Sequence, residues 1–200
     1  MSACNDESSS RRMLPGFKLA TDVVTPEEET CLIALMESCN PQHYPGDERG
    51  GLRAISYGWK YDLGNASFSP CDPAPEGFAF VRDIAARFAG LAPERFVQCL
   101  LNRYETCAEI PWHCDKSIWE DIVGISLGAP TTMGFRRSRQ GGYEFGEAKL
   151  PRRSMYLLSG DVRKHFDHCI PPVKETRWSI TFRTFSDEGR RLRDSLVAAR

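Results

Sequence analysis

The chain has 200 residues, of which 41% are hydrophobic and 26% are charged, and its formal net charge is -1. This length suffices for one domain with a sizeable core, and no stretch approaches the roughly 18 apolar residues that a membrane span requires. Residues 1–12 are polar and lack the apolar core of a signal peptide. We therefore expect a disordered tail over residues 1–16 and a protein of the cytoplasm, or of the nucleus in a eukaryote.

The first half of the chain predicts two helices and few strands. A strand is expected over residues 17–24, and Thr25, Pro26 and Glu28 then supply a helix cap, a proline at the first helical position and a glutamate at the third. Residues 40–52 and 69–75 predict loops, with a short aromatic strand over residues 53–61 between them. Residues 77–91 predict the second helix from their i, i+3, i+4, i+7 apolar spacing.

From residue 96 onward the apolar period shortens towards two. Candidate strands cover residues 96–104, 123–127, 132–135, 143–150, 154–158, 166–170 and 178–184. Two helices followed by many short strands predict an α+β domain over residues 17–186, whose part from about residue 96 is a sandwich or jelly roll. Residues 187–200 predict a short charged helix.

The distribution of charge and the spacing of the cysteines limit which kinds of ligand and metal site are expected. Residues 1–100 carry 9 Lys and Arg against 14 Asp and Glu, whereas residues 101–200 carry 17 against 13. The second half is basic, which suits an anionic ligand. The eight cysteines form no CxxC pair, so a closed zinc site is not expected, and without an export signal we expect reduced thiols.

His113 and Asp115 are the first candidate metal ligands. On an extended segment two residues that are two apart leave the same face, whereas Cys114 points the other way. A third ligand has to come from another strand, where His165 and His168 compete. We favour His168, which lies in a strand-like segment, because His165 follows two basic residues. Two imidazoles and one carboxylate are the facial triad that holds iron(II), although an HxD pattern also arises by chance.

Residues 177–183 alternate strictly between apolar and polar side chains. The apolar face belongs in a core, and the polar face carries Arg177, Ser179, Thr181 and Arg183. Six residues of strand span roughly 20 Å, and two arginines leaning together leave a gap of roughly 7 Å, which a five-carbon dicarboxylate fits. The alternative is an edge strand whose arginines face solvent.

A second polar pair precedes the HxD pattern. Asn102 and Tyr104, also two apart, could donate hydrogen bonds to the same ligand. In the alternative interpretation Asn102 begins a turn and Tyr104 packs against Trp112.

The order of these motifs resembles that of the AlkB family of iron(II)- and 2-oxoglutarate-dependent dioxygenases. The matching motifs, over about residues 96–185, are Asn102-x-Tyr104, His113-x-Asp115, Gly124-Ile125-Ser126-Leu127-Gly128, His168-x-Ile170 and Arg177-x-Ser179-x-Thr181-Phe182-Arg183. The resemblance implies a double-stranded β-helix, or jelly roll, with the N-terminal helices packed outside. It also implies Fe(II), 2-oxoglutarate and O2 as cofactor and co-substrates.

The resemblance also implies roles for single residues. Iron would be bound by His113, Asp115 and His168. The co-substrate 2-oxoglutarate would be held by Asn102, Tyr104, Arg177 and Arg183, with Arg177 at its distal carboxylate. Apart from the resemblance, Ser179 and Thr181 are small and polar and lie between the two arginines, so they could form the floor of that gap.

Candidate substrate contacts are Tyr57, Trp59, Tyr61 and Lys116. The three aromatic residues fall where the family places its substrate lid, and they could stack on a base that has left its helix or be ordinary core residues. Ser117 departs from the DNA-repair members, which carry there an acidic residue that contacts the damaged base. Basic residues at 136–139, 152–153 and 163–164 could contact phosphates or form a solvated rim.

We therefore expect an enzyme that oxidatively demethylates N-alkylated bases in nucleic acid, with single strands favoured, working as a monomer and away from membranes. One alternative is the same oxygenase chemistry on a protein side chain or a small molecule. The other is a jelly-roll binding module without catalysis, in which the HxD pattern is fortuitous or binds a structural metal.

Overall fold

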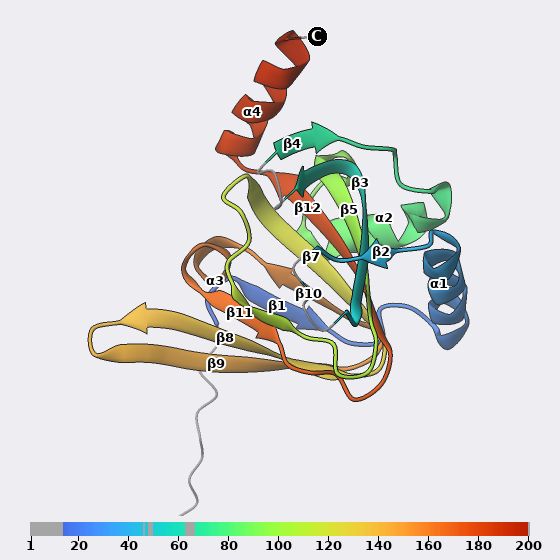
Figure 1. Cartoon of the computed structure of the whole chain (residues 1–200), viewed down its shortest axis with the longest axis vertical. Coiled ribbons are helices and arrows are strands. Elements are labelled where there is room, and N and C mark those ends of the chain that lie inside the picture. Colours follow the sequence, from blue (N-terminus) through green and yellow to red (C-terminus); the bar gives the residue numbers. More distant parts are fainter. Residues whose placement is uncertain (1–13, 46, 48–49, 63–66, 200) are drawn as a thin grey trace, which may run out of the picture.

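The computed structural model describes residues 14–45, 47, 50–62 and 67–199, and its strands form two antiparallel sheets (Figure 1). The larger sheet has eight strands in the order β1-β10-β7-β12-β5-β3-β2, with β4 paired to β3. The smaller sheet has four strands in the order β6-β11-β8-β9. This arrangement is the jelly roll that the strand pattern predicts.

The elements have the following bounds. The strands are β1 (Phe17–Ala20), β2 (Gln42–His43), β3 (Leu52–Asp62), β4 (Ser67–Pro70), β5 (Phe96–Tyr104), β6 (Ile110–His113), β7 (Trp119–Gly128), β8 (Thr131–Arg139), β9 (Gly142–Leu150), β10 (Ser154–Leu158), β11 (Asp167–Ile170) and β12 (Arg177–Phe185). The α-helices are α1 (Pro26–Ser38), α2 (Ala79–Ala89), α3 (Gly160–His165) and α4 (Asp187–Ala198).

Helices α1 and α2 cover the outer face of the larger sheet. Thr25 and Glu28 form the predicted capping box, in which each side chain accepts a hydrogen bond from the other residue's backbone N–H. One apolar core joins Leu32 of α1 and Val81 of α2 to the sheet residues beneath them, among them Ile180. These three side chains are at most 1% exposed, so the helices are fixed to the sheet by burial.

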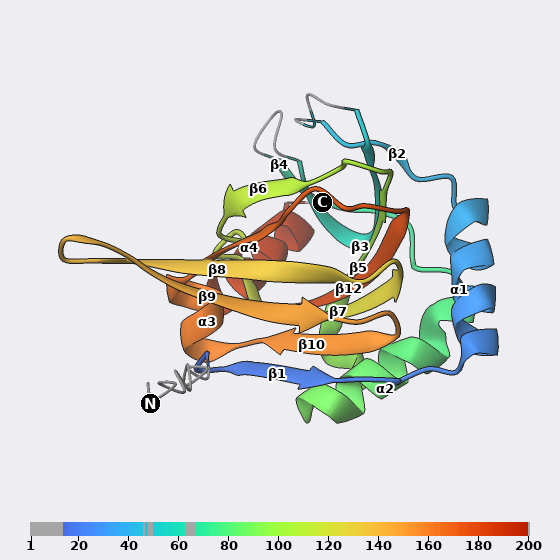
Figure 2. The ribbon, with the colours of Figure 1, turned by 90° about the horizontal axis from the view of Figure 1, so that it is seen from below.

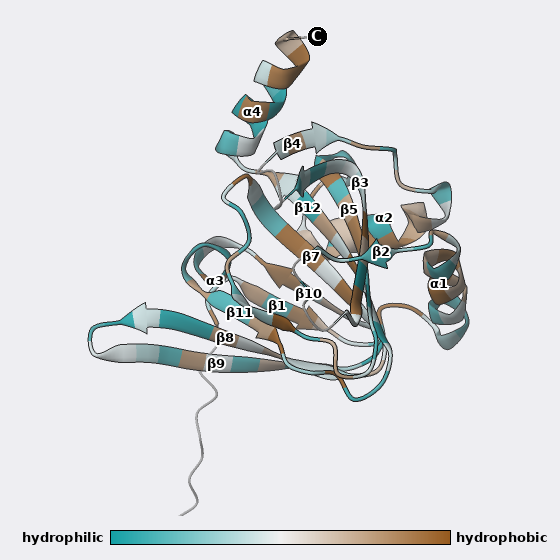
Figure 3. Ribbon diagram, viewed as in Figure 1, coloured by the Kyte–Doolittle hydropathy of each residue, from teal (hydrophilic) through white to brown (hydrophobic). Residues whose placement is uncertain are grey.

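A second core fills the space between the two sheets. Phe135 and Met133 of β8 contribute from the smaller sheet, and Ile122 of β7 and Tyr156 of β10 contribute from the larger one. The β8–β9 hairpin extends beyond this core on the side opposite α1 (Figures 1 and 2), and its outer part is mostly hydrophilic in Figure 3. The space between the sheets is where β12 presents its polar face.

The outcome for the predicted elements is mixed. The strands over 96–104 and 154–158 have the predicted bounds, and α1 begins and α4 forms as predicted. The first strand ends at Ala20, short of the predicted residue 24, and β2, β4, β6 and α3 were not predicted. The tail expected over residues 1–16 lies, apart from its last three residues, outside the described residues.

Strand β12 is central, because it pairs with β5 on one side and β7 on the other. The alternative of an edge strand with a solvated face is therefore wrong. Within the described ranges, no helix is both long and apolar enough to cross a membrane.

Candidate active site

His113, Asp115 and His168 come together where β6 ends beside β11. His113 and His168 are direct partners across these antiparallel strands, and their ring centroids lie 4.3 Å apart. Nε2 of His168 lies 3.5 Å from Oδ2 of Asp115. One ligand atom from each of the three residues lies within 4.8 Å of the others, which is close enough for all three to share one metal ion.

His165, the competing third ligand, lies elsewhere. Its side chain is 63% exposed at the end of α3, and its Nε2 atom lies 3.9 Å from Asp161. His168 has a relative exposure of 9%. Of the two histidines, His168 is the one that pairs with His113 across these strands, so its position favours it as the third ligand.

The charges around the three residues suit metal binding. Burial raises the pKa of Asp115, but Arg183, His168 and His113 outweigh burial and hold that pKa well below its usual range. Burial is also the largest cause that lowers the pKa of His168, to about 4, although Asp115 opposes this shift. The carboxylate is therefore ionised and the imidazole of His168 neutral near pH 7, which are the protonation states that a metal requires.

Arg177 is a fully buried cation whose terminal nitrogens are not hydrogen-bonded to any residue that the structure describes. Its relative exposure is 0%, and its Nε–H donates to Oγ of Ser126 over 3.1 Å. Its guanidinium carbon lies 4.7 Å from the centre of the Tyr104 ring. Neither Nη1 nor Nη2 has a hydrogen-bond partner among the described residues. A buried charge is costly unless it is paired, so this guanidinium is arranged for an anion that comes from outside the chain.

Arg183 is the other arginine of the polar face of β12. Its Nη2 donates to Oδ1 of Asp115 over 2.8 Å and its Nη1 donates to Oε1 of Gln98 over 2.8 Å. Its buried Nε–H has no hydrogen-bond partner within the described part of the chain. Asn102 and Ser179 lie between the two arginines as cross-strand partners, and Asn102 Nδ2 lies 3.5 Å from Ser179 Oγ. Asn102 is thus inside strand β5 and does not begin a turn.

Three residues of this interior were given no role in the sequence analysis, although Ser126 is part of the motif over residues 124–128. Gln98 and Ser126 contact the two arginines, and Tyr156 lies opposite Gly124 across the β10–β7 pair. Burial raises the pKa of Tyr156 to about 12. A Cβ on Gly124 would lie 2.1 Å from the Tyr156 ring, so only glycine leaves room for it. A glycine inside an otherwise apolar strand was the available signal.

The four candidate substrate contacts do not gather in one place. Tyr57 packs against the core beneath the helices, and the pKa of its hydroxyl is raised mainly by burial. Trp59 stacks on Phe68 at 4.9 Å. Lys116 Nζ lies 5.1 Å from the centre of the Tyr61 ring, and both residues line one cavity. Tyr61 and Lys116 therefore line a space that a substrate could enter, whereas Tyr57 faces the opposite side of the sheet.

Most of the basic residues singled out in the sequence are paired with carboxylates. Arg136 pairs with Asp167 at 2.9 Å, and Arg137 pairs with Asp161 at 2.8 Å. The remaining pairs are Arg137 and Arg139 with Glu144, Arg152 and Arg153 with Glu29, Arg153 with Asp22, and Lys164 with Glu120. These side chains are therefore not a row of unpaired cations.

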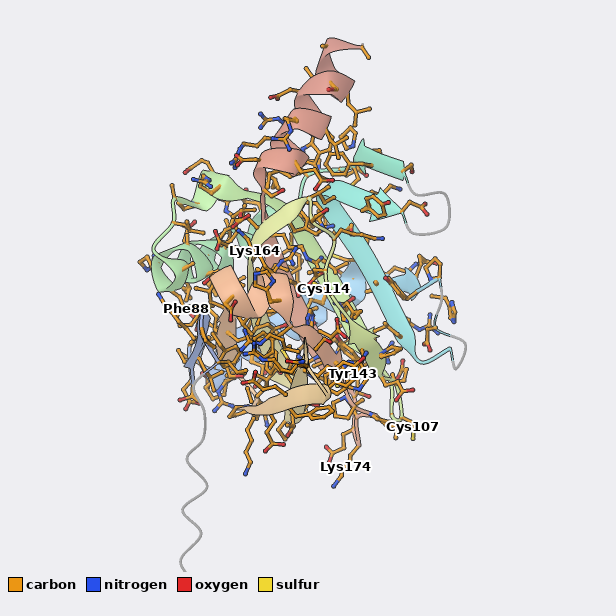
Figure 4. All side chains as sticks on the ribbon, turned by 90° about the vertical axis from the view of Figure 1, so that its left-hand side faces the viewer. Phe88, Cys107, Cys114, Tyr143, Lys164 and Lys174 are labelled. Atoms are coloured by element: carbon orange, nitrogen blue, oxygen red, sulfur yellow. The ribbon has the colours of Figure 1, made fainter. Side chains whose placement is uncertain are left out.

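Arg163 is buried, contrary to both interpretations of it as a phosphate contact or a solvated rim residue. Its relative exposure is 4%, and its Nη2 donates to the backbone carbonyls of Lys116 and Trp119, each over 2.6 Å. Its side chain therefore shapes the loop that follows Asp115. In Figure 4, which looks towards the tip of the β8–β9 hairpin, Cys114 and Lys164 lie above Tyr143 on this face.

Comparisons with known proteins identify the family of the chain. The family model of the 2OG-Fe(II) oxygenase superfamily matches residues 36–192. An uncharacterized protein of Acanthamoeba polyphaga mimivirus is 29% identical over 199 residues, covering 88% of this chain and 87% of its own. The Alpha-ketoglutarate-dependent dioxygenase AlkB of Salmonella typhimurium is 28% identical, covering 83% of this chain and 77% of its own.

A further relative is larger than this chain. The tRNA (carboxymethyluridine(34)-5-O)-methyltransferase alkbh8 of Xenopus tropicalis is 29% identical over 84% of this chain, but only 27% of that protein is covered. The solved structure of OsALKBH1 superimposes with a TM-score of 0.65 over 86% of this chain and 98% of its own, at 16% identity, and so supports the fold. The chain therefore belongs to the 2OG-Fe(II) oxygenase superfamily, which uses Fe(II), 2-oxoglutarate and O2, and it is an AlkB-like member of that superfamily.

Proposed function

We propose that this protein removes alkyl groups from N-alkylated bases of nucleic acid by oxidation, as an Fe(II)/2-oxoglutarate-dependent dioxygenase. The observation that carries the dioxygenase part is the buried guanidinium of Arg177, whose two terminal nitrogens have no hydrogen-bond partner among the described residues, on the same strand as the arginine that contacts Asp115. The nucleic-acid part is supported by relatives whose names refer to tRNA methylation and to AlkB.

Iron(II) would be held by His113, Asp115 and His168. The donor set of two imidazoles and one carboxylate fits, because the three ligand atoms lie within 4.8 Å of one another. Iron(II) and 2-oxoglutarate supply, when bound, the oxidation of a C–H bond by O2 with release of succinate and CO2. The residues around them provide orientation, charge and exclusion of water.

The co-substrate 2-oxoglutarate would lie along the polar face of β12. Arg177 would pair with one carboxylate through its two terminal nitrogens, which have no partner in the described ranges, and Tyr104 beneath it limits the directions that the guanidinium can take. Arg183, with its unpaired Nε–H, would stabilise the other carboxylate near the metal. Asn102 and Ser179, on the floor between the two arginines, would contact the carboxylates of 2-oxoglutarate.

The substrate would enter beside Lys116, which directly follows the ligand Asp115. A base has to leave its stack to reach the metal, so single-stranded nucleic acid is the favoured form. Tyr61 is the aromatic side chain that lines this entrance together with Lys116. Trp59, stacked on Phe68, would support Tyr61 and not meet the base itself. Tyr57 has no place in this part of the proposal.

A second candidate function is the same oxidation of a small molecule or a protein side chain. It is favoured by the carboxylate partners of Arg136 and Arg137, which reduce the positive potential available to a phosphate backbone. A substrate with few phosphates would be less affected by this pairing.

The decisive experiment is a turnover screen with iron(II), 2-oxoglutarate and methylated single-stranded DNA and RNA. We expect formaldehyde and succinate to form in equal amounts from at least one N-methylated oligonucleotide and not from its unmethylated counterpart. The variant Asp115→Ala serves as the control, because it lacks the carboxylate ligand. Succinate without formaldehyde from every oligonucleotide would contradict the nucleic-acid substrate and favour the second candidate.

A further inference from the structure

A cavity of about 600 Å³ is bounded by three segments that are distant in the sequence, one of which directly follows the proposed iron ligand Asp115. The hairpin of β3 and β4 contributes Tyr61 and Phe68, and the loop after Asp115 contributes Lys116 and Ser117. The third wall is the C-terminal helix α4. This volume falls within the range of cavities that bind small organic ligands, about 300–1,000 Å³.

Helix α4 is anchored to the loop that follows Asp115, although it projects from the body of the protein beside β4 (Figure 1). The N–H of Ser186 donates to the carbonyl of Ile118 over 2.9 Å, and the Ser186 hydroxyl caps the helix by accepting from the N–H of Gly189. Gly189 packs so closely that a Cβ there would lie 2.3 Å from the Ile118 carbonyl oxygen. The position of α4 is therefore tied to the loop that carries Lys116.

One face of α4 points to the cavity. Glu188, Leu192 and Leu196 are spaced four residues apart, so they lie above one another on the helix, and all three line the cavity. Hydrophilic and hydrophobic segments alternate along α4 in Figure 3. Leu192 is 39% exposed and Leu196 is 37% exposed, whereas Val197, at 62%, does not line the cavity.

We propose that α4 is the outer wall of the substrate site and determines which alkylated base, with its sugar, can bind. The inference rests on the proposed function, because the occupant is a planar base from a single strand of nucleic acid. The Tyr61 and Phe68 rings offer one apolar surface, and Leu192 and Leu196 offer another from α4. Base–aromatic contact of this kind tolerates different bases and needs a further contact to discriminate among them.

The polar residues of the cavity supply that further contact. Glu188 has no ion-pair partner in the part of the chain that the structure describes, so its carboxylate is free to accept a hydrogen bond from an exocyclic N–H of a base. Lys116, which directly follows the proposed metal ligand Asp115 in the sequence, places a positive charge over the Tyr61 ring at the cavity, where a phosphate of the bound nucleotide can meet it. The cavity thus combines apolar walls with a carboxylate, a cation and the side chains of Ser117 and Ser195, and this lining matches a nucleotide better than an apolar peptide.

The test compares the double variant Leu192→Glu, Leu196→Glu with the matched control Val197→Glu, which adds a charge to the same helix outside the cavity. Each protein is given iron(II), 2-oxoglutarate and the methylated oligonucleotide that the unchanged protein demethylates best. We expect KM for the oligonucleotide to rise by at least about tenfold in the double variant and by less than about twofold in the control. The charge-transfer absorption of the iron–2-oxoglutarate complex reports that each variant is folded and loaded.

A milder variant tests the same inference in case the double variant does not fold. Glu188→Gln keeps the shape of the side chain and removes its charge, and we expect it to change the ratio of kcat/KM between methylated adenine and methylated cytosine. An unchanged KM in the double variant and an unchanged ratio in Glu188→Gln would overturn the role of α4, while demethylation by the unchanged protein would keep the proposed function.

Two other outcomes would also overturn the inference. If the unchanged protein demethylates no oligonucleotide, the proposed function fails and the role of α4 in base selection fails with it. If the double variant keeps its KM but changes the molar mass measured by light scattering, the apolar face of α4 serves contact between copies of the chain.

Discussion

Arg183 donates a hydrogen bond from Nη2 to Oδ1 of Asp115 over 2.8 Å, so one arginine of the anion-binding strand also orients a proposed metal ligand. Gln98 accepts from the other end of the same guanidinium, which fixes its plane. The iron site and the 2-oxoglutarate site are therefore coupled through a single side chain.

We predict that Arg183→Met weakens iron binding as well as 2-oxoglutarate binding. Without the guanidinium, the pKa of Asp115 rises towards its usual value and the carboxylate is no longer oriented. Loss of a partner that orients a metal ligand reduces metal affinity by about 10–100-fold. Titration of iron(II) in the presence of saturating 2-oxoglutarate, followed by the charge-transfer absorption, measures the change. An iron affinity equal to that of the unchanged protein would contradict the coupling.

Replacement of Arg177 is expected to separate binding from stability. In Arg177→Leu the affinity for 2-oxoglutarate should fall by about 2–5 kcal/mol, because a buried charge pair is lost. The ligand-free protein should be no less stable, since the variant removes a buried guanidinium whose terminal nitrogens have no partner among the residues that the structure describes. Thermal unfolding with and without 2-oxoglutarate measures both effects. Arg103→Leu, on the neighbouring strand β5, is the control and should keep the ligand-induced rise in Tm.

The stability of the metal-free protein should depend on pH through His168. In the folded protein the pKa of His168 is about 4, below its ordinary value of 6.5. Below pH 6.5 the His168 imidazole is protonated in the unfolded chain, whereas in the folded protein it is protonated only near pH 4 and below. The free energy of unfolding should therefore fall as the pH is lowered from 6.5 to 4, with no contribution from this group above that window.

Denaturant unfolding at pH 7, 5.5 and 4.5 tests this dependence. The slope should be smaller in His168→Gln, which has no proton to take up, and should persist in the exposed His165→Gln. Asp115, whose pKa is held low, should add a further loss only below its ordinary value of 3.8. Equal slopes in the unchanged protein and in His168→Gln would show that the prediction is wrong.

Gly124→Ala is expected to destabilise the protein, because the new methyl group would overlap the Tyr156 ring. Overpacking of this kind costs about 1–3 kcal/mol. Combining Gly124→Ala with Tyr156→Leu should recover part of that loss, and the coupling between the two sites can be read from a double-mutant cycle of unfolding free energies. Additive effects of the two substitutions would mean that the ring can move aside freely.

The sequence was most informative where one strand has an apolar face and a polar face. The alternation over residues 177–183 predicted both the apolar face of β12, which packs under the helices, and its polar face. His113 and Asp115 were likewise predicted from a local spacing of two. These features depend on the geometry of a single strand, so the residues themselves suffice to find them.

Features that depend on a distant partner were not predicted. The burial of Arg163 follows from backbone carbonyls more than forty residues away, at Lys116 and Trp119. The space for Tyr156 exists only because Gly124 lies opposite it on another strand. The short strand β6 and helix α3 likewise form where neighbouring elements pair with or cover them, and their own sequences carry weak signals.

The insertion of β12 between β5 and β7 has a consequence for how the protein matures. A shift of that strand by one residue would turn both guanidinium groups into the hydrophobic layer under the helices. The same shift would turn the aromatic side chains of β12 into the space between the two sheets. The site for 2-oxoglutarate therefore forms only when β12 has paired in its correct register. A chain in which β12 has paired in the wrong register would not bind 2-oxoglutarate. Because a ligand stabilises the state that binds it, 2-oxoglutarate added during refolding should favour the correct pairing.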